Sequence, residues 1–396
     1  MTRKICADNI FTGTELTGPG HVLLFSEEGI IDSIAPLAEA GEGVEFISGI
    51  ICPGFVNAHC HIELSHLKNK IPQHTGLVDF VQSVMTGRAA SDEEKQEAMQ
   101  QAERELYESG TVAVGDICNT TDSIPLKNNS KLYWHNFIEV SGFVDAGAQK
   151  RFDDAKKVAA VFEKEIVDQP PTGLEAAVGV NKIPVGITPH APYSVSKKLF
   201  ELINDEKGNL ISIHNQESRA EDELYKSKSG DFLRLYQNFG IDISSFQATG
   251  KSSFASWLRY ITNGQKIISV HNTFTDTEDI ANSKFKIQNS KLFFCLCPNA
   301  NLYIENVLPP IEMLMENNCN IILGTDSYAS NTSLNIFEEI KTIQKNFPLI
   351  NLGAILRWAT LNGATALGIA DRYGSFEKGK QPGIILIEDK NAKRLY

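Results

Sequence analysis

Short runs of apolar and β-branched residues alternate along this chain with longer segments of helical character. Eight such runs, each ended by polar, glycine or proline residues, occupy residues 49–59, 111–119, 131–142, 183–190, 210–217, 266–272, 291–299 and 320–326. Segments between them are rich in helix formers with apolar residues at helical spacing, as at 91–109, 146–169 and 333–347. Alternating strands and helices predict an α/β protein with a parallel sheet.

The number of strand and helix units indicates the fold class. Eight consecutive units predict a (β/α)8 TIM-type barrel, which we place at residues 51–371. An open doubly wound sheet is the alternative, and it is disfavoured because no glycine-rich phosphate loop follows the first strand. Residues 1–50 and 372–396 carry further short strand patterns. We expect these two terminal segments to form one small β-sandwich domain.

Composition and charge narrow the class of partner. The chain has 396 residues, of which 42% are hydrophobic and 22% charged, as in ordinary globular proteins. A net charge of −12 without any basic block argues against nucleic-acid binding, so we expect a small-molecule partner, and we allow for a homo-oligomer. No signal-peptide core or bilayer-spanning apolar stretch is recognisable, and the seven cysteines form no C-x-x-C pair. These features predict a cytoplasmic protein that does not bind membranes.

Candidate metal ligands stand where the predicted strands end. They are His59 and His61 on the first strand, His190 on the fourth, His214 on the fifth, His271 on the sixth and Asp326 on the eighth. Active sites of TIM-type barrels lie at the carboxyl ends of the strands, so these side chains should converge on one rim. Because strand side chains alternate, His59 and His61 point the same way and Cys60 points away.

Three imidazoles and one carboxylate, from His59, His61, His214 and Asp326, form a nitrogen and oxygen donor set suited to Zn, Fe or Mn. Such a set leaves a coordination position open for water. Taken singly, a histidine at a strand end is more often a hydrogen-bonded rim residue, and the aspartate of a GTD turn is more often a helix cap. Their joint placement at one end of the strands favours a metal site.

Several motifs, in this order and spacing, resemble the amidohydrolase superfamily over nearly the whole chain. PGFVNAHCH (53–61) resembles the family's PGxxNxHxH strand, and IHNQE (213–217) its H-x-x-E after the fifth strand. SVHN (269–272) is similar to its sixth-strand histidine, and LGTDSYASN (323–331) to its TDxxxSN. FEKGKQPGIILI (376–387) resembles the usual return strand, and a β-sandwich built from both termini is also a family habit.

The resemblance implies a reaction and a cofactor. His59, His61, His214 and Asp326 would hold one divalent metal, with zinc favoured over Fe or Mn. The fourth strand ends in TPHAPYS without a lysine, and Lys182 precedes that strand, so the bridging ligand of binuclear members is missing. Glu217 would carry a proton between the attacking water and a ring nitrogen, and His271 with Asp326 would hold the water and relay its proton. We therefore expect a hydrolase of non-peptide C–N bonds, namely a deaminase of cyclic amidines.

Within the superfamily, HCHIELS (59–65), HAPYSVS (190–196) and the insertion 219–265 are most similar to deaminases of aminodeoxyfutalosine. Deaminases of S-adenosylhomocysteine and methylthioadenosine come next. By this resemblance His190 contacts a purine nucleoside-like substrate, Asn301 shapes the pocket, and Glu139 binds a ribose or carboxylate group. Glu63 lies in a loop expected to face the substrate, and Arg88 offers a cation to a substrate carboxylate.

Ala300 and Ser327 depart from the serine and glycine expected at their positions, which places the substrate in more doubt than the reaction class. A guanine-type deaminase and a triazine-type chlorohydrolase are alternative enzymes on the same metal site. A non-catalytic binding protein on this fold would lack metal ligands, and none of the expected ligands is missing.

Overall fold

The computed structural model describes residues 2–166, 184–206, 210–287 and 291–396, and it confirms the α/β class. Each of the eight predicted apolar runs contains a strand. One four-stranded parallel sheet has the order β10 (Val185–Pro189), β9 (Tyr133–Val140), β8 (Thr111–Cys118) and β7 (Phe55–Cys60). A second has the order β11 (Leu210–Asn215), β12 (Lys266–His271), β13 (Leu292–Leu296) and β14 (Asn320–Leu323).

Backbone hydrogen bonds join the two parallel sheets on both sides at the carboxyl ends of their strands. On one side the His214 amide donates to the His190 carbonyl at 3.0 Å, next to β10 and β11. On the other side the Thr325 amide donates to the His59 carbonyl at 3.0 Å, and Cys60 pairs with Asp326 as an isolated parallel bridge. Three of the residues predicted to form the metal site, His59, His214 and Asp326, therefore take part in the bonds that join the two sheets.

The predicted first strand, 49–59, is interrupted at Gly54. Residues before it form β6 (Ile50–Pro53), which pairs antiparallel with β15 (Ile384–Glu388), whereas β7 after it pairs with β8. A Cβ atom at Gly54 would lie 2.2 Å from Val112 Cγ1 and 2.7 Å from the Pro382 carbonyl oxygen. Only glycine fits at this point, where the chain passes from one sheet to the next. The apolar run is continuous in sequence, so the pattern of residues did not predict the break.

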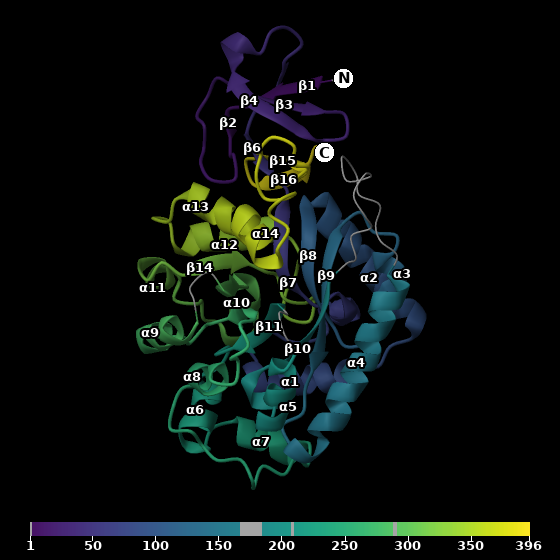
Figure 1. Cartoon of the computed structure of the whole chain (residues 1–396), viewed down its shortest axis with the longest axis vertical. Helices are drawn as coiled ribbons and strands as arrows, with labels where there is room; N and C mark the ends of the chain where they lie inside the picture. The colour runs from purple at the N-terminus through teal and green to yellow at the C-terminus, as the bar shows by residue number, and fades with distance from the viewer. Residues whose placement is uncertain (1, 167–183, 207–209, 288–290) are drawn as a thin grey trace.

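The strands of the terminal segments lie together at one end of the molecule, beside both chain ends (Figure 1). One four-stranded sheet has the order β4 (Ile31–Pro36), β3 (His21–Ser26), β1 (Thr2–Cys6) and β5 (Glu45–Phe46). The other has the order β16 (Asn391–Arg394), β15, β6 and β2 (Asn9–Ile10). The second sheet thus combines strands from both ends of the chain, as the terminal patterns indicated.

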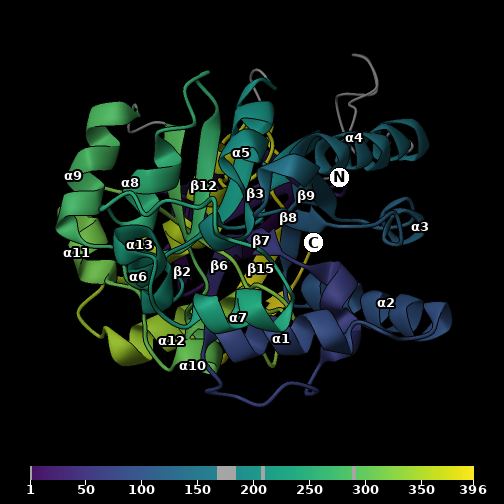
Figure 2. The same ribbon diagram turned by 90° about the horizontal axis from the view of Figure 1, so that it is seen from below.

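Helices surround the strands when the molecule is viewed from below (Figure 2). They are α1 (Leu77–Gly87), α2 (Asp92–Glu108), α3 (Ile124–Lys127), α4 (Ala148–Glu165), α5 (Lys197–Asn204), α6 (Arg219–Ser227), α7 (Phe232–Asn238), α8 (Ser253–Leu258), α9 (Thr277–Lys286), α10 (Pro298–Glu305), α11 (Ile311–Glu316), α12 (Ile336–Asn346), α13 (Leu352–Arg357) and α14 (Gly363–Leu367). The three predicted helical segments correspond to α2, α4 and α12. The end of the segment 146–169 and the start of the strand 183–190 extend beyond the described residues.

The insertion 219–265 contributes α6, α7 and α8. Helix α7 lies against α1, where Arg234 Nη1 is 2.5 Å from Asp79 Oδ1 and Asn238 Nδ2 donates to Gln82 Oε1 at 2.8 Å. These two helices supply much of the apolar wall of the cavity described below. Among the helices in the described part of the chain, none is long and apolar enough to cross a bilayer.

Candidate functional site

Four buried side chains from three strand ends converge on one point. His59 is the second-last residue of β7, His61 is the first residue after that strand, His214 lies in β11, and Asp326 follows β14. The His61 Nε2 atom lies 3.2 Å from Nε2 of His59, 3.2 Å from Nε2 of His214 and 3.3 Å from Asp326 Oδ1. Donor atoms held about 2.0–2.1 Å from a tetrahedral divalent ion lie about 3.3 Å from one another. The spacing of this His₃Asp set therefore fits a single divalent metal ion.

Neighbouring groups orient three of these four side chains. His214 Nδ1 lies 2.7 Å from the His190 carbonyl oxygen, which can only accept, so Nδ1 carries the proton and Nε2 presents its lone pair to the site. His59 Nδ1 lies 3.4 Å from Ser212 Oγ, and Ser330 donates a short hydrogen bond to Asp326 Oδ2. Cys60 packs instead with Met99 and Leu106 of α2, as the strand alternation predicts.

The charge states of the buried ligands also suit metal binding. Burial lowers the pKa of His61 well below its ordinary value and that of His214 to about 3, so both imidazoles are neutral. Burial alone would raise the pKa of Asp326, but its contact with His59 and the facing imidazoles of His61 and His271 hold it well below its usual range. His61 and His214 thus present neutral nitrogen donors beside the ionised carboxylate of Asp326.

Glu217 and His271 lie beside this cluster. Glu217 Oε1 is 3.5 Å from His271 Nε2, and both side chains are buried. Burial, with the nearby charge of Asp326, raises the pKa of the Glu217 carboxyl well above its ordinary value. His271 and Asp326 adopt left-handed backbone conformations, with φ of 70° and 57°. Such conformations are uncommon outside glycine and are often found at functional sites, where they redirect the chain at a strand end.

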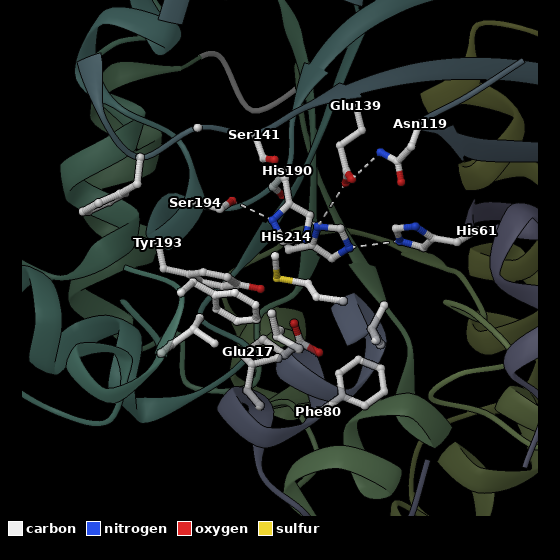
Figure 3. Close-up of a pocket in the computed structure, with 18 of the residues that line it drawn as sticks. His61, Phe80, Asn119, Glu139, Ser141, His190, Tyr193, Ser194, His214 and Glu217 are labelled. Carbon is white, nitrogen blue, oxygen red and sulfur yellow. Dashed lines mark hydrogen bonds and ion pairs between the residues drawn. The ribbon is translucent and has the colours of Figure 1, made fainter. Parts of the chain in front are cut away.

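A cavity of about 490 Å³ opens over these residues, within the range of small-molecule pockets. Side chains from α1, α7 and the loop after β10 form its apolar wall, namely Leu77, Phe80, Val84, Tyr193, Leu235 and Tyr236. His61, His214, Glu217, His271 and Asp326 line it from the strand ends. Figure 3 shows Glu217 and Phe80 on one side of the histidines, with Glu139 and Asn119 on another.

The second side of the cavity is polar. Asn119 Nδ2 donates to Glu139 Oε2 at 2.8 Å, and Arg88 Nη1 lies 3.4 Å from Asn119 Oδ1. Glu139 Oε1 is buried and has no hydrogen-bond partner among the described residues. Ser194 Oγ lies 3.1 Å from the Ala191 carbonyl, to which it donates, and 2.6 Å from His190 Nδ1. His190 Nδ1 is therefore the donor to Ser194, and its Nε2 is left as an acceptor (Figure 3).

Two predicted substrate contacts lie behind the cavity wall. Asn301 is fully buried, with its Nδ2 donating to Thr273 Oγ1 at 2.7 Å and lying 3.3 Å from His271 Nδ1. Glu63 accepts the backbone amides of Asn119 at 3.0 Å and Thr120 at 3.2 Å, and burial raises its pKa to about 7. Asn301 thus supports His271, and Glu63 supports the loop that carries Asn119. Tertiary contacts determine where the side chains of Asn301 and Glu63 point, and the local sequence does not specify these directions.

Asn119 is the cavity residue that sequence reasoning missed. It follows β8 directly, at the end of the predicted run 111–119, so the rule that identified the histidines also applied to it. An asparagine at a strand end is a weaker indication of a functional site than a histidine, because asparagine is common in ordinary turns. Arg88, Glu139 and His190 line the cavity at the positions that the sequence analysis considered for substrate contacts.

Comparison with known proteins identifies the class. The sequence model of the Amidohydrolase family matches residues 50–395, so the chain belongs to that family, and the predicted resemblance is confirmed. It is 30% identical over 345 residues to an adenosine deaminase of Helicobacter pylori, covering 85% of this chain and 78% of that protein. It is 26% identical over 393 residues to a 5′-deoxyadenosine deaminase of Methanococcus vannielii, covering 94% and 83%.

Solved structures share the fold. Helicobacter pylori aminofutalosine deaminase in complex with methylthio-coformycin superposes with a TM-score of 0.80 at 22% identity, covering 98% of this chain and 93% of that one. An adenosine deaminase from Xanthomonas campestris with bound zinc superposes with a TM-score of 0.70 at 22% identity, covering 97% and 84%.

Proposed function

We propose that this protein is a metal-dependent hydrolytic deaminase, which removes an exocyclic amine as ammonia from a purine nucleoside-like substrate. The main support for this proposal is the buried His₃Asp cluster, which lies at the base of one cavity with Glu217 and His271 beside it. Membership of the amidohydrolase family and the relatives named as nucleoside deaminases support the same reaction. A cytoplasmic location stays a prediction from the sequence.

We also propose that the two parallel sheets close into one eight-stranded barrel over residues 54–371, and that residues 1–53 and 372–396 form a small β-sandwich domain. The expected boundary after residue 50 moves to Gly54, because β6 (Ile50–Pro53) belongs to a terminal sheet. The backbone hydrogen bonds on both sides of the two parallel sheets support closure. The pairing of β6 with β15 and of β2 with β6 supports one terminal domain built from both ends of the chain.

One metal ion, zinc, is the proposed cofactor. A second group, Glu139, His190 and His214, also has donor atoms within 4.8 Å of one another. His214 cannot serve there through Nδ1, because that atom donates its proton to the His190 carbonyl. His190 follows β10 where binuclear relatives would need a bridging lysine, and Lys182 lies outside the described residues. Zinc is favoured by the nitrogen-rich donor set and by the zinc-bound neighbour.

When bound, such an ion would act as a Lewis acid and would lower the pKa of water to about 7. The protein side chains handle the protons. Burial raises the pKa of Glu217, so its carboxyl group holds a proton that it can donate to the ring nitrogen beside the amine-bearing carbon. His271 holds the attacking water from the side, and Asp326 accepts its proton for delivery to the departing amine. As ammonia leaves, the proton of the newly added hydroxyl returns to Glu217, so the reaction consumes one water and releases the oxo form of the ring and ammonia.

Glu139 and His190 are proposed to recognise the substrate's sugar. Glu139 Oε1 makes no hydrogen bond among the described residues and lies 4.0 Å from His214 Nδ1. This atom and His190 Nε2 are two acceptors facing one cavity, so a matching ligand brings two donors. Vicinal hydroxyls of a ribose meet that need. Arg88 lines the same side and offers a cation to a carboxylate on the substrate, which suits aminodeoxyfutalosine or S-adenosylhomocysteine.

Ammonia release tests the proposed function directly. The zinc-loaded protein is given aminodeoxyfutalosine, S-adenosylhomocysteine, methylthioadenosine, 5′-deoxyadenosine, adenosine, guanine and cytosine in turn. We expect ammonia from at least one purine nucleoside and none from cytosine, because the sugar-binding acceptors have no partner in a free pyrimidine. Absence of ammonia from every purine nucleoside would contradict the proposal.

Glu139→Gln should lower kcat/KM for ribonucleosides about 10- to 100-fold, the range for losing a hydrogen bond to a buried charged group. The same variant should leave kcat/KM for a matching 2′,3′-dideoxynucleoside almost unchanged, since that substrate has no hydroxyls to lose. Glu163→Gln, an exposed glutamate on α4, is the matched control. Equal losses for both substrates would remove Glu139 from sugar recognition.

A further inference from the structure

The loop that presents Glu217 has an unusual backbone. Between the end of β11 at Asn215 and the start of α6 at Arg219, Gln216 adopts a left-handed conformation with φ of 45°. A glutamine pays a steric penalty for this conformation, so surrounding contacts must hold it. The conformation of Gln216 sets the direction in which the next residue, Glu217, enters the cavity.

Glu221 supplies the contacts that hold this loop. Its Oε1 accepts the backbone amide of Glu217 at 2.8 Å, and its Oε2 accepts the backbone amide of Gln216 at 3.0 Å. Ser253 Oγ, from α8, lies 3.3 Å from the same Oε2. The Glu221 side chain is completely buried, so water does not compete for these bonds. One carboxylate therefore grips two consecutive amides, one of them belonging to Glu217 itself.

The local sequence would assign Glu221 a different partner. Ser218 is the N-cap of α6, and Ser-Arg-Ala-Glu is the pattern of a capping box, in which the glutamate reaches back to the amide of the serine. Here Ser218 does accept from Ala220, but the carboxylate bonds of Glu221 go to the two residues before the cap. The glutamate is directed at the loop that carries Glu217 rather than at the helix end.

The same loop is tied to the strand end that carries His271. The Gln216 side chain accepts from Thr275 Oγ1 at 2.6 Å and donates to Asp279 Oδ2 at 2.8 Å, and its carbonyl accepts the Phe274 amide at 3.0 Å. All three partners follow β12, which ends at His271. By holding Gln216, Glu221 fixes the loop that carries Glu217 relative to the end of β12, which carries His271.

Other buried carboxylates support strand ends in a similar way, but through different residues. Asp116 Oδ1 accepts the amide of Ile62 at 2.9 Å, and Glu339 Oε2 accepts the amide of Asn299 at 2.9 Å. The residues they bond, Ile62 and Asn299, lie near the site but do not line the cavity. Glu221 is bonded to the main chain of the proposed proton carrier, which gives it the most direct influence on the reaction.

We propose that Glu221 is a positioning residue, which aims the Glu217 carboxyl at the reacting ring by clamping the amides of residues 216 and 217. This inference rests on the proposed function, because it assumes that Glu217 carries the proton. A displacement of about 1 Å at a reacting group can cost about 100-fold in rate. Glu221 bonds neither the groups proposed to bind the sugar nor the proposed metal ligands. Loosening its hold on the two amides should therefore lower kcat and leave KM and zinc binding almost unchanged.

The test compares Glu221→Gln with Glu217→Gln and with Glu223→Gln, which makes the same change at an exposed position two residues further along α6. A glutamine at 221 keeps the shape but turns an NH₂ group toward one backbone amide. With adenosine, 5′-deoxyadenosine and methylthioadenosine as substrates, we expect Glu221→Gln to lower kcat about 10- to 100-fold. KM should change less than about threefold, zinc content should stay at the wild-type level, and Glu223→Gln should match wild type.

The outcomes separate the two proposals. Wild-type kcat in Glu221→Gln, together with an inactive Glu217→Gln, overturns the positioning role and leaves the proposed function intact. An active Glu217→Gln overturns both. A kcat that falls only in proportion to lost zinc or lost folded protein assigns Glu221 a structural role instead. Should Glu221→Gln not fold, Glu221→Asp decides, because its shorter carboxylate also loosens the clamp: reduced kcat with full zinc content supports the inference, and wild-type kcat overturns it.

Discussion

Turnover by Glu217→Gln should fall by about 10²- to 10⁴-fold, the usual contribution of one general acid–base group, while zinc binding stays unchanged. The glutamine fits the same space next to His271 but cannot exchange a proton with a ring nitrogen. Glu217 lies beside the His₃Asp cluster without belonging to it, so the metal ligands keep their geometry. Rates of ammonia release and zinc content per chain, measured on the same preparation, check both parts of the prediction.

A variant that keeps near wild-type turnover would remove Glu217 from the mechanism and would point to another proton carrier in the cavity. Loss of zinc together with turnover would instead indicate that Glu217 supports the ligands. Glu223→Gln serves again as the matched control, since it lies on the following helix and is exposed to solvent.

Asp326→Ala should lose both zinc and turnover, and it should also unfold at a lower temperature than the zinc-loaded wild type. Removing the only carboxylate from the cluster leaves three neutral imidazoles to hold a divalent cation. Bound metal stabilises the folded state by about 4 kcal/mol when its free concentration is about 1,000 times Kd. Treating the wild type with a chelator should therefore lower its stability by a comparable amount, and adding zinc back should restore stability and turnover together.

Zinc content, thermal unfolding and ammonia release provide three independent readouts of this prediction. Asp371→Ala, at an exposed aspartate remote from the cluster in sequence, should leave all three unchanged. Full zinc occupancy in Asp326→Ala would contradict the proposed ligand set, and turnover by chelated protein with no zinc would contradict the metal-dependent mechanism.

The metal cluster could be predicted from the sequence because it depends on strand periodicity. His59 lies in β7 and His61 is the first residue after it, so the alternation of the strand predicts that their side chains share a face. His214, His271 and Asp326 each stand where an apolar run ends, and parallel strands place such ends at one edge. The structure brings together the residues that these rules selected.

Polar residues outside the strands were harder to predict, because strand alternation does not set the direction of their side chains. Glu63 was expected to face the substrate, yet its carboxylate accepts the backbone amide of Asn119. Asn301 was expected to shape the pocket, and its side chain contacts His271 and Thr273. Glu221 follows the capping-box pattern, but its carboxylate reaches the amides of residues 216 and 217. Glu63 and Glu221 accept backbone amides that burial would otherwise leave unpaired, whereas Asn301 donates to the Thr273 hydroxyl.

The sequence by itself determined the α/β class, the eight strand runs, the family, and the residue types gathered at the strand ends, because local periodicity and chain order encode all of these. The tertiary structure alone decided the break at Gly54, the pairing of Asn119 with Glu139, and the clamp on Glu217. These features depend on contacts between segments far apart in the chain or on loops without regular geometry, where long-range packing decides which way each side chain points.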